Sequence, residues 1–146
     1  MILSKEIAVY LNLAACKLKL YTASMLRKYG IELTPEQFLL IDLLWNQGTM
    51  TQQKVADTMQ KDKNSVTKLV DALEQKGLVI RQKSDTDRRE NILVLTQKAL
   101  EMKFGAKETG ISILEDMIEG ISEEELKSFL VTLSKLTSNM DKFISQ

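Results

Sequence analysis

The sequence predicts a mainly α-helical protein that carries one small β-ribbon. Only one of its 146 residues is proline, and the helix-favouring residues Leu, Lys, Glu and Met are abundant. Apolar residues recur at steps of three and four through both ends of the chain, which is the spacing of one helix face. The stretch richest in β-forming residues lies between residues 78 and 95, so the ribbon is expected there.

The N-terminal part is expected to form one long helix, residues 2–29, that stops at Gly30. Its apolar stripe consists of Ile7, Tyr10 or Leu11, Ala14, Leu18, Tyr21 and Met25. Further apolar residues, Leu3, Leu13 and Leu20, lie off this stripe. More than one buried face in so small a protein suggests a partner chain.

A second helix begins at Thr34, because Thr-Pro-Glu-Gln combines an N-cap, a proline at the first helical position and a capping-box Gln. It is expected to end near Gly48 and to be largely core. The residues expected in the core are Phe38, Leu39, Ile41, Leu43, Leu44 and Trp45. A brief strand at Thr49 and Met50 follows.

Two short helices joined by a tight turn come next. Thr51 caps the first, which runs to about Met59, and Asp62 caps the second. The second helix covers residues 63–76 and ends at Gly77, since glycine accepts the left-handed conformation at little cost. Its expected buried stripe is Val66, Leu69, Val70 and Leu73. Such a pair, with a polar free face on its second helix, is a helix-turn-helix candidate.

The β-rich runs 78–81 and 92–95 are separated by the polar loop 84–87, which predicts a hairpin with a long tip. A helix-turn-helix followed by such a hairpin is a winged helix-turn-helix. The hairpin would be its two-stranded wing.

The C-terminal part is expected to form two further helices. Thr96 caps the first, which runs to about Glu119, and a capping box at residues 122–125 begins the second. The seam of the last helix is Leu126, Phe129 or Leu130, Leu133, Leu136, Met140, and Phe143 or Ile144. Its repeat is close to 3.5 residues, a spacing suited to packing against other long helices. Both ends of the chain are therefore long amphipathic helices.

Composition excludes several functional classes. The chain has no His and no glycine-rich phosphate loop, and one Cys cannot make a thiolate zinc site. We therefore expect no enzyme, no metal and no cofactor. No apolar run approaches the roughly 20 residues that span a bilayer, and the N-terminus lacks the pattern of a signal peptide. With a single Cys, a reducing cytoplasm is the expected compartment.

The net charge is zero, but the charges are unevenly placed. Residues 49–90 hold 9 basic and 7 acidic side chains, whereas residues 91–146 hold 6 basic and 9 acidic ones. The asymmetry is weak, so phosphate binding would depend on where individual basic side chains lie.

Three stretches of the sequence resemble the MarR family of bacterial transcription regulators: LTPEQFLLIDLLW, MTQQKVADTMQKDKNSVTKLVDALEQKGLVIR and DTDRRENILVLTQKA. The last is the most specific, with Asp87-Arg88-Arg89 followed by Leu95-Thr96 at the family's spacing. The terminal helices match in pattern alone. The chain departs from the family at Ala99, where Gly is usual, and in a wing that is acidic as well as basic.

The resemblance implies a homodimer whose N- and C-terminal helices interlock. Residues 1–33 would form the N-terminal dimerisation helix, residues 34–96 the DNA-binding lobe, and residues 97–146 the helices that complete the dimerisation region. The resemblance further implies recognition helices in successive major grooves of double-stranded DNA and wings in the adjacent minor groove. It implies a repressor on a palindromic operator with half-sites about 10 base pairs apart. In many relatives a small-molecule effector bound between the two regions weakens DNA binding.

The candidate DNA-binding residues lie near the start of the second helix of the pair, where helix-turn-helix proteins meet base edges. The candidates for reading bases are Asn64, Ser65, Thr67 and Lys68. The candidates for contacting phosphates are Lys61 and Lys63 beside this helix start, and Gln52 and Gln53 at the start of the preceding helix. An ordinary solvated helix face is the alternative interpretation.

In the wing, Arg89 is the candidate for the minor groove, whose negative potential attracts arginine in A·T-rich DNA. Arg88 is expected to contact phosphate, and Asp87 to pair with a basic neighbour and brace the loop. The alternative is a charged, solvated turn in which Asp87 and Arg89 only balance each other.

Three further alternatives stay open. Cys16 could sense oxidants as a low-pKa thiolate, although its apolar neighbours favour a small buried side chain. Tyr10, Tyr21 and Trp45 could line an effector pocket, but aromatics at helical spacing are usually core, so no ligand residues are assigned. A winged helix can also serve as a protein-interaction module without specific DNA binding, and would then lose nothing on Arg89→Ala.

Overall fold

The computed structural model describes residues 2–146, and the side chains of all of these except 104–110 and 113. The chain divides into two compact units, Met1–Ile113 and Leu114–Gln146. Among the residues described, no helix is both long and apolar enough to cross a membrane.

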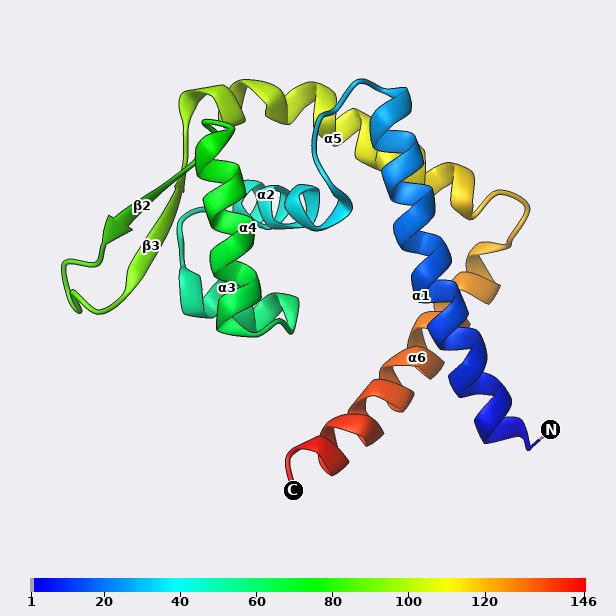
Figure 1. Ribbon diagram of the computed structural model, residues 1–146. Coiled ribbons are helices and arrows are strands. Elements are labelled where there is room, and N and C mark those ends of the chain that lie inside the picture. Colours follow the sequence, from blue (N-terminus) through cyan, green and yellow to red (C-terminus); the bar gives the residue numbers. More distant parts are fainter. Residues whose placement is uncertain (1) are drawn as a thin grey trace. The chain divides into compact units, whose positions relative to one another are not determined.

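The helices are α1 (Leu3–Lys28), α2 (Pro35–Gln47), α3 (Gln52–Met59), α4 (Lys63–Gln75), α5 (Gln97–Met117) and α6 (Glu123–Ile144). The strands are β1 (Met50–Thr51), β2 (Val79–Lys83) and β3 (Asn91–Leu95), as drawn in Figure 1. The fold is thus mainly α with one small sheet, as the sequence predicts, and every expected helix is present.

The helices α2 and α6 begin at capping boxes, whose local hydrogen bonds are predictable from the sequence. Thr34 and Gln37 form a complete capping box at α2, with the Gln37 N–H donating to Thr34 Oγ1 at 3.2 Å. Ser122 and Glu125 form another capping box at α6. Gly77, directly after the C-cap of α4, has a φ of +73°, which confirms the predicted left-handed stop.

The sheet is antiparallel with the strand order β1-β3-β2. β2 and β3 form the predicted two-stranded wing, and Arg81 lies opposite Leu93 in its register. β1 adds a third short strand by pairing Met50 with Leu93. The wing strands reach further toward the tip than the predicted runs 78–81 and 92–95. The loop between them covers residues 84–90, which includes the predicted polar loop 84–87 and three further residues.

One hydrophobic core holds α2, α3, α4 and the sheet together. Its fully covered residues include Leu40, Ile41, Leu44, Val55, Val66, Val70, Leu73 and Leu93. Trp45 stands edge-on to Phe38, with ring centroids 6.1 Å apart. The Trp45 Nε1–H also donates to the carbonyl of Ala99 at 3.1 Å, which ties the start of α5 to this core.

The prediction that Leu39 belongs to the core is wrong. The buried residues of α2 recur at steps of three and four from Gln37 to Trp45, which defines one face of the helix. Leu39 falls outside that face, and its side chain is 52% exposed.

The apolar stripes of the two terminal helices are mostly uncovered within the single chain. Leu26 is the one buried residue of α1, and no residue of α6 is buried, among side chains that the structure describes. Cys16 is exposed, so the interpretation of its side chain as a small buried one is wrong for the isolated chain. The buried residue of α1, Leu26, lies near the C-terminal end of the helix, ten residues after Cys16.

Candidate nucleic-acid interface

The N-terminal end of α4 is held by Asp62. One carboxylate oxygen accepts the Ser65 N–H at 2.8 Å and the other accepts the Ser65 hydroxyl at 2.9 Å. These donors hold the pKa of Asp62 below its usual value. Ser65 is a base-reading candidate, but its hydroxyl proton is already donated to the capping residue Asp62 and its side chain is half-buried.

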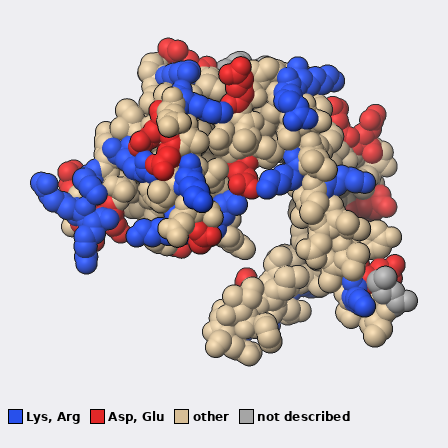
Figure 2. Space-filling model, viewed as in Figure 1, with Lys and Arg blue, Asp and Glu red and all other residues tan. Residues whose placement is uncertain are grey.

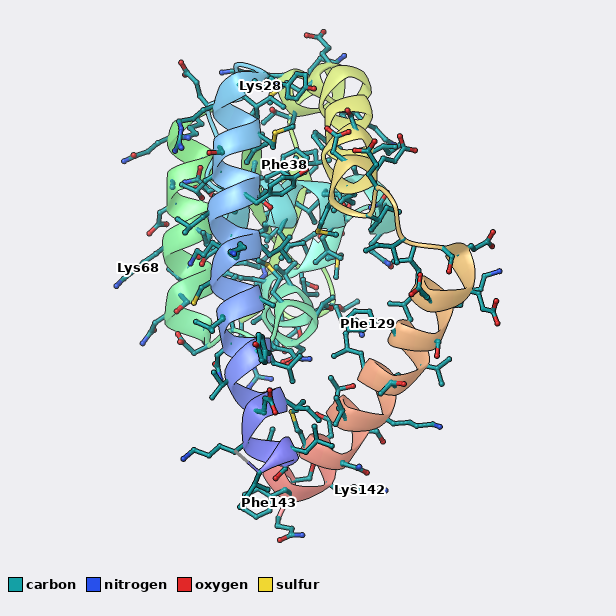
Figure 3. The ribbon with its side chains drawn as sticks, turned by 90° about the vertical axis from the view of Figure 1, so that its right-hand side faces the viewer. Lys28, Phe38, Lys68, Phe129, Lys142 and Phe143 are labelled. Carbon is teal, nitrogen blue, oxygen red and sulfur yellow. The ribbon has the colours of Figure 1, made fainter. Side chains whose placement is uncertain are left out.

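Among the base-reading candidates, Asn64 and Lys68 are the most accessible to a ligand. Both are exposed, and neither side chain has a hydrogen-bonding or ionic partner among the described residues. Lys68 points away from the lobe, whereas Phe38 points into it (Figure 3). Thr67, by contrast, is half-buried and bonded on both sides, because its Oγ1 donates to the Lys63 carbonyl and accepts from Gln52.

The phosphate-contacting candidates also differ in their freedom. Lys63 is exposed, and within the described structure its ammonium has no partner. Lys61 Nζ lies 3.5 Å from Glu36 Oε2, and the other oxygen of this carboxylate, Oε1, accepts a hydrogen bond from Lys19 at 2.6 Å. Lys19 first and Lys61 second lower the pKa of Glu36. Gln53 donates to Asp57 on the same helix at 2.9 Å.

At the wing tip, Asp87 accepts both the backbone and the side chain of Arg89. Its oxygens lie 3.0 Å from the Arg89 backbone N, 3.1 Å from Nε and 3.2 Å from Nη2. This pairing holds the pKa of Asp87 below its usual value. The Arg89 side chain is nevertheless 91% exposed, and Arg88 beside it is exposed too. The pair fixes the loop while the guanidinium stays accessible.

Ser84, which the sequence analysis did not select, organises the same loop. Its side chain is buried, and its Oγ accepts the N–H groups of Thr86 and Asp87, both at 3.3 Å. The Ser84 N–H donates to the Glu90 carbonyl across the loop at 3.1 Å. A serine that opens a polar loop is a signal for this side-chain-to-backbone turn, and it could have been recognised.

The wing and the helix pair meet around one shared hollow of about 190 Å³. It is lined by Gln52, Gln53, Lys63, Val66, Arg89, Glu90 and Asn91. The wing tip and the N-terminal end of α4 thus lie on the same side of the lobe (Figure 1), and Figure 2 shows Lys and Arg side chains gathered at the tip among a few carboxylates. Donors from three elements converge here, as an acceptor-rich phosphate backbone would require.

Several proteins of known sequence are similar to this chain. Residues 33–91 match the family model described as MarR family. The HTH-type transcriptional regulator MhqR of Bacillus subtilis (strain 168) is 31% identical over 118 residues, which cover 81% of this chain and 80% of MhqR. The organic hydroperoxide resistance transcriptional regulator of the same organism is 31% identical over 104 residues, covering 70% of this chain and 71% of the relative.

Solved structures share the fold. The transcriptional repressor CouR, bound to a 23-mer DNA duplex, matches with a TM-score of 0.80 at 27% identity and covers 92% of this chain and 94% of its own. A MarR-family regulator from Rhodococcus sp. RHA1 matches with a TM-score of 0.79 at 25% identity, covering 93% and 95%. These relatives are transcription regulators and not enzymes, and the chain belongs to the MarR family of winged helix-turn-helix transcription regulators.

Proposed function

We propose that the protein is a homodimeric repressor that binds a palindromic operator in double-stranded DNA of the cytoplasm. The observation that carries the proposal is the convergence of α3, α4 and the wing on one hollow lined by Lys63 and Arg89. Two-fold symmetry would place two such lobes on successive major grooves, with half-sites about 10 base pairs apart.

Residues 34–96 are the proposed DNA-binding lobe. Asn64 and Lys68 are exposed at the start of α4 and would read base edges directly. Ser65 and Thr67 are half-buried and would contribute at the edge of the contact. Arg89 would leave Asp87 for the minor groove, and Arg88 would contact phosphate.

The remaining phosphate contacts are proposed at the rim of the lobe. Lys63 is free to meet a phosphate, and Gln52 and Gln53 line the same hollow. Lys61 would have to exchange Glu36 for a phosphate oxygen. Each cation–phosphate contact releases counterions from DNA, so these lysines would set the salt dependence of binding.

Residues 1–33 and 97–146 are the proposed dimerisation region. Large apolar side chains of α1 and α6 are exposed in the single chain, among them Leu3, Tyr10, Leu20, Phe129, Leu130 and Phe143. Each helix thus carries exposed apolar side chains of its own, and apolar surface of this kind usually marks an interaction site. A second copy of the chain would cover it.

A small-molecule effector is proposed to weaken DNA binding by changing the separation of the two recognition helices. An open hollow of about 690 Å³ supports such a site. Tyr29, Leu33 and Met102 supply apolar walls, and Lys76 and Lys98 supply charge. The hollow adjoins the C-terminal end of α4, so an occupant there could bias the position of that helix.

Oxidation of Cys16 is a second candidate for control. Its thiol is exposed rather than buried, and one relative is named as an organic hydroperoxide resistance regulator. Peroxide would convert the thiolate to a sulfenic acid. Cys16→Ser should then abolish a peroxide-dependent loss of DNA binding, whereas an identical response of both proteins would eliminate this route.

The proposal is tested by titrating labelled DNA from upstream of the protein's own gene at two salt concentrations. Wild type should bind it tightly, specifically and with strong salt sensitivity. Arg89→Ala should lose about tenfold in affinity, the usual scale for one charge-assisted contact. Asp85→Ala, also at the wing tip, is the matched control. If wild type does not distinguish this DNA from random duplex, and selection from random sequences yields no preferred duplex either, a protein-interaction module becomes the better explanation of the fold.

A further inference from the structure

Arg81 is the middle residue of β2 and lies opposite Leu93 of β3. Its guanidinium is largely covered, with 20% of the side chain exposed. Nη2 lies 2.8 Å from Asp71 Oδ1 and Nη1 lies 3.2 Å from Glu74 Oε1, both on α4. The two carboxylates hold the guanidinium in place and balance its charge, so Arg81 is not a free DNA contact.

The remaining donors of Arg81 reach across the helix pair. Nη2 donates to the Thr67 carbonyl on α4 at 3.1 Å, and Nε donates to Gln52 Oε1 on α3 at 3.3 Å. Gln52 Nε2 in turn donates to Thr67 Oγ1 at 2.9 Å. A single side chain therefore joins the wing to both helices of the helix-turn-helix.

The chemistry of arginine determines which group donates and which accepts in the hydrogen bonds from Arg81 through Gln52 to Thr67. A guanidinium can only donate, so the amide oxygen of Gln52, and not its nitrogen, must face Arg81. The Gln52 amino group must then face Thr67, whose Oγ1 accepts from it. The hydroxyl proton of Thr67 is consequently directed to the Lys63 carbonyl, 2.9 Å away.

We propose that Arg81 is a positioning residue that sets the polarity of Gln52, so that its amide presents a hydrogen-bond donor to DNA. The amino group has two N–H bonds, and only one is used by Thr67. Gln52 lines the hollow together with Lys63 and Arg89, so its second N–H adds a neutral donor beside two cations. The matching partner is a phosphate oxygen of the duplex backbone.

This inference rests on the proposed DNA binding, and it adds a residue that would not touch DNA. Without Arg81 the Gln52 amide could turn over and present its oxygen to a phosphate. An oxygen facing an oxyanion is repelled, whereas an N–H is attracted. Arg81 would thus act on affinity through Gln52, in addition to the effect of its ion pairs with Asp71 and Glu74.

A double-mutant cycle separates this role from a purely structural one. Arg81→Met should weaken operator binding about tenfold, which is the scale of one hydrogen bond to a charged group. In a Gln52→Ala background the same substitution should cost clearly less than it does in wild type, because only the effect of the lost ion pairs with Asp71 and Glu74 remains. In a Gln53→Ala background it should again cost about tenfold, because Gln53 pairs with Asp57 and not with Arg81. Equal losses in all three backgrounds would overturn the proposal.

Nuclear magnetic resonance of the Gln52 side-chain amide tests the orientation without DNA. In wild type its two amino protons should differ in exchange, since one is bonded to Thr67 and the other faces solvent. Both Arg81→Met and Thr67→Val should remove this difference, and Thr67→Val serves if Arg81→Met does not fold. If wild type binds no specific DNA, the proposed function fails while this measurement still decides the Gln52 polarity; equivalent amino protons in wild type would refute it.

Discussion

The recognition helix α4 and the C-terminal helix α6 both carry regular apolar stripes, but they differ in what covers those stripes. Val66, Val70 and Leu73 of α4 are completely buried within the chain. No side chain of α6 is buried, and Phe143 is 77% exposed. Phe129 and Phe143 can be seen projecting from α6 in Figure 3.

The difference indicates that the two helices depend on different stabilising partners. The free energy that holds α4 in place comes from its own lobe and is independent of protein concentration. Exposed apolar surface gives α6 no such contribution until something covers it. In the proposed dimer, the stability of the terminal helices would therefore depend on protein concentration, and that of the lobe would not.

The largest expected effect is in the lobe. Leu73→Ala removes a fully buried side chain between α4 and the rest of the core, and large-to-small changes of this kind cost about 3 kcal/mol. Chemical denaturation should show this loss at every protein concentration. A loss that shrinks as the concentration rises would place Leu73 in an intermolecular contact and contradict the comparison.

The next effect is in α6. Leu130→Glu puts a charge on a side chain that is 62% exposed in the chain but covered in the proposed dimer, at a cost of about 2 kcal/mol to association. Light scattering should show monomers at concentrations where wild type is dimeric. Thr132→Glu, exposed on the opposite side of α6, is the control and should remain dimeric. If neither substitution changes the mass, this stripe does not form the dimer.

A smaller effect is expected at the wing tip, where polar contacts replace a core. Ser84→Ala leaves the N–H groups of Thr86 and Asp87 without the buried hydroxyl oxygen that accepts them, which costs about 1 kcal/mol. Amide hydrogen exchange of residues 84–90 should speed up while the exchange of α4 stays unchanged. Ser84→Thr keeps the hydroxyl and should restore protection; if it does not, the oxygen is not what holds the loop.

The parts of this fold that the sequence predicts are those determined within a few residues. The capping boxes at Thr34 and Ser122, and the stop at Gly77, each depend on neighbours no more than four residues away. Arg81 could not be recognised in this way, because its partners Gln52 and Thr67 lie 29 and 14 residues distant. Leu39 and Cys16 were misjudged because an apolar neighbourhood in sequence does not say which face another element covers.

The smallest expected effect is a pH-dependent change in stability at the wing, which the interior of the lobe should not show. The pKa of Asp87 is lowered by Arg89, so the folded carboxylate holds its proton less tightly than the unfolded one. Its contribution to stability is therefore complete above the ordinary aspartate pKa of about 4 and is lost as the pH falls through the lower folded value. Asp87→Asn should unfold at a slightly lower temperature than wild type at pH 7, and this difference should shrink as the pH falls below the ordinary aspartate pKa of about 4.

Leu73→Ala provides the contrast for this last measurement. It removes no ionisable group, so its gap from wild type should persist across the same acid range in which the Asp87→Asn gap closes. Asp85→Asn, an exposed carboxylate in the same loop, controls for the change in net charge. If the Asp85→Asn and Asp87→Asn gaps close together, bulk charge and not the Arg89 pairing is responsible. If the difference in unfolding temperature closes in acid for Asp87→Asn alone, the exposed Asp87–Arg89 ion pair is responsible for it.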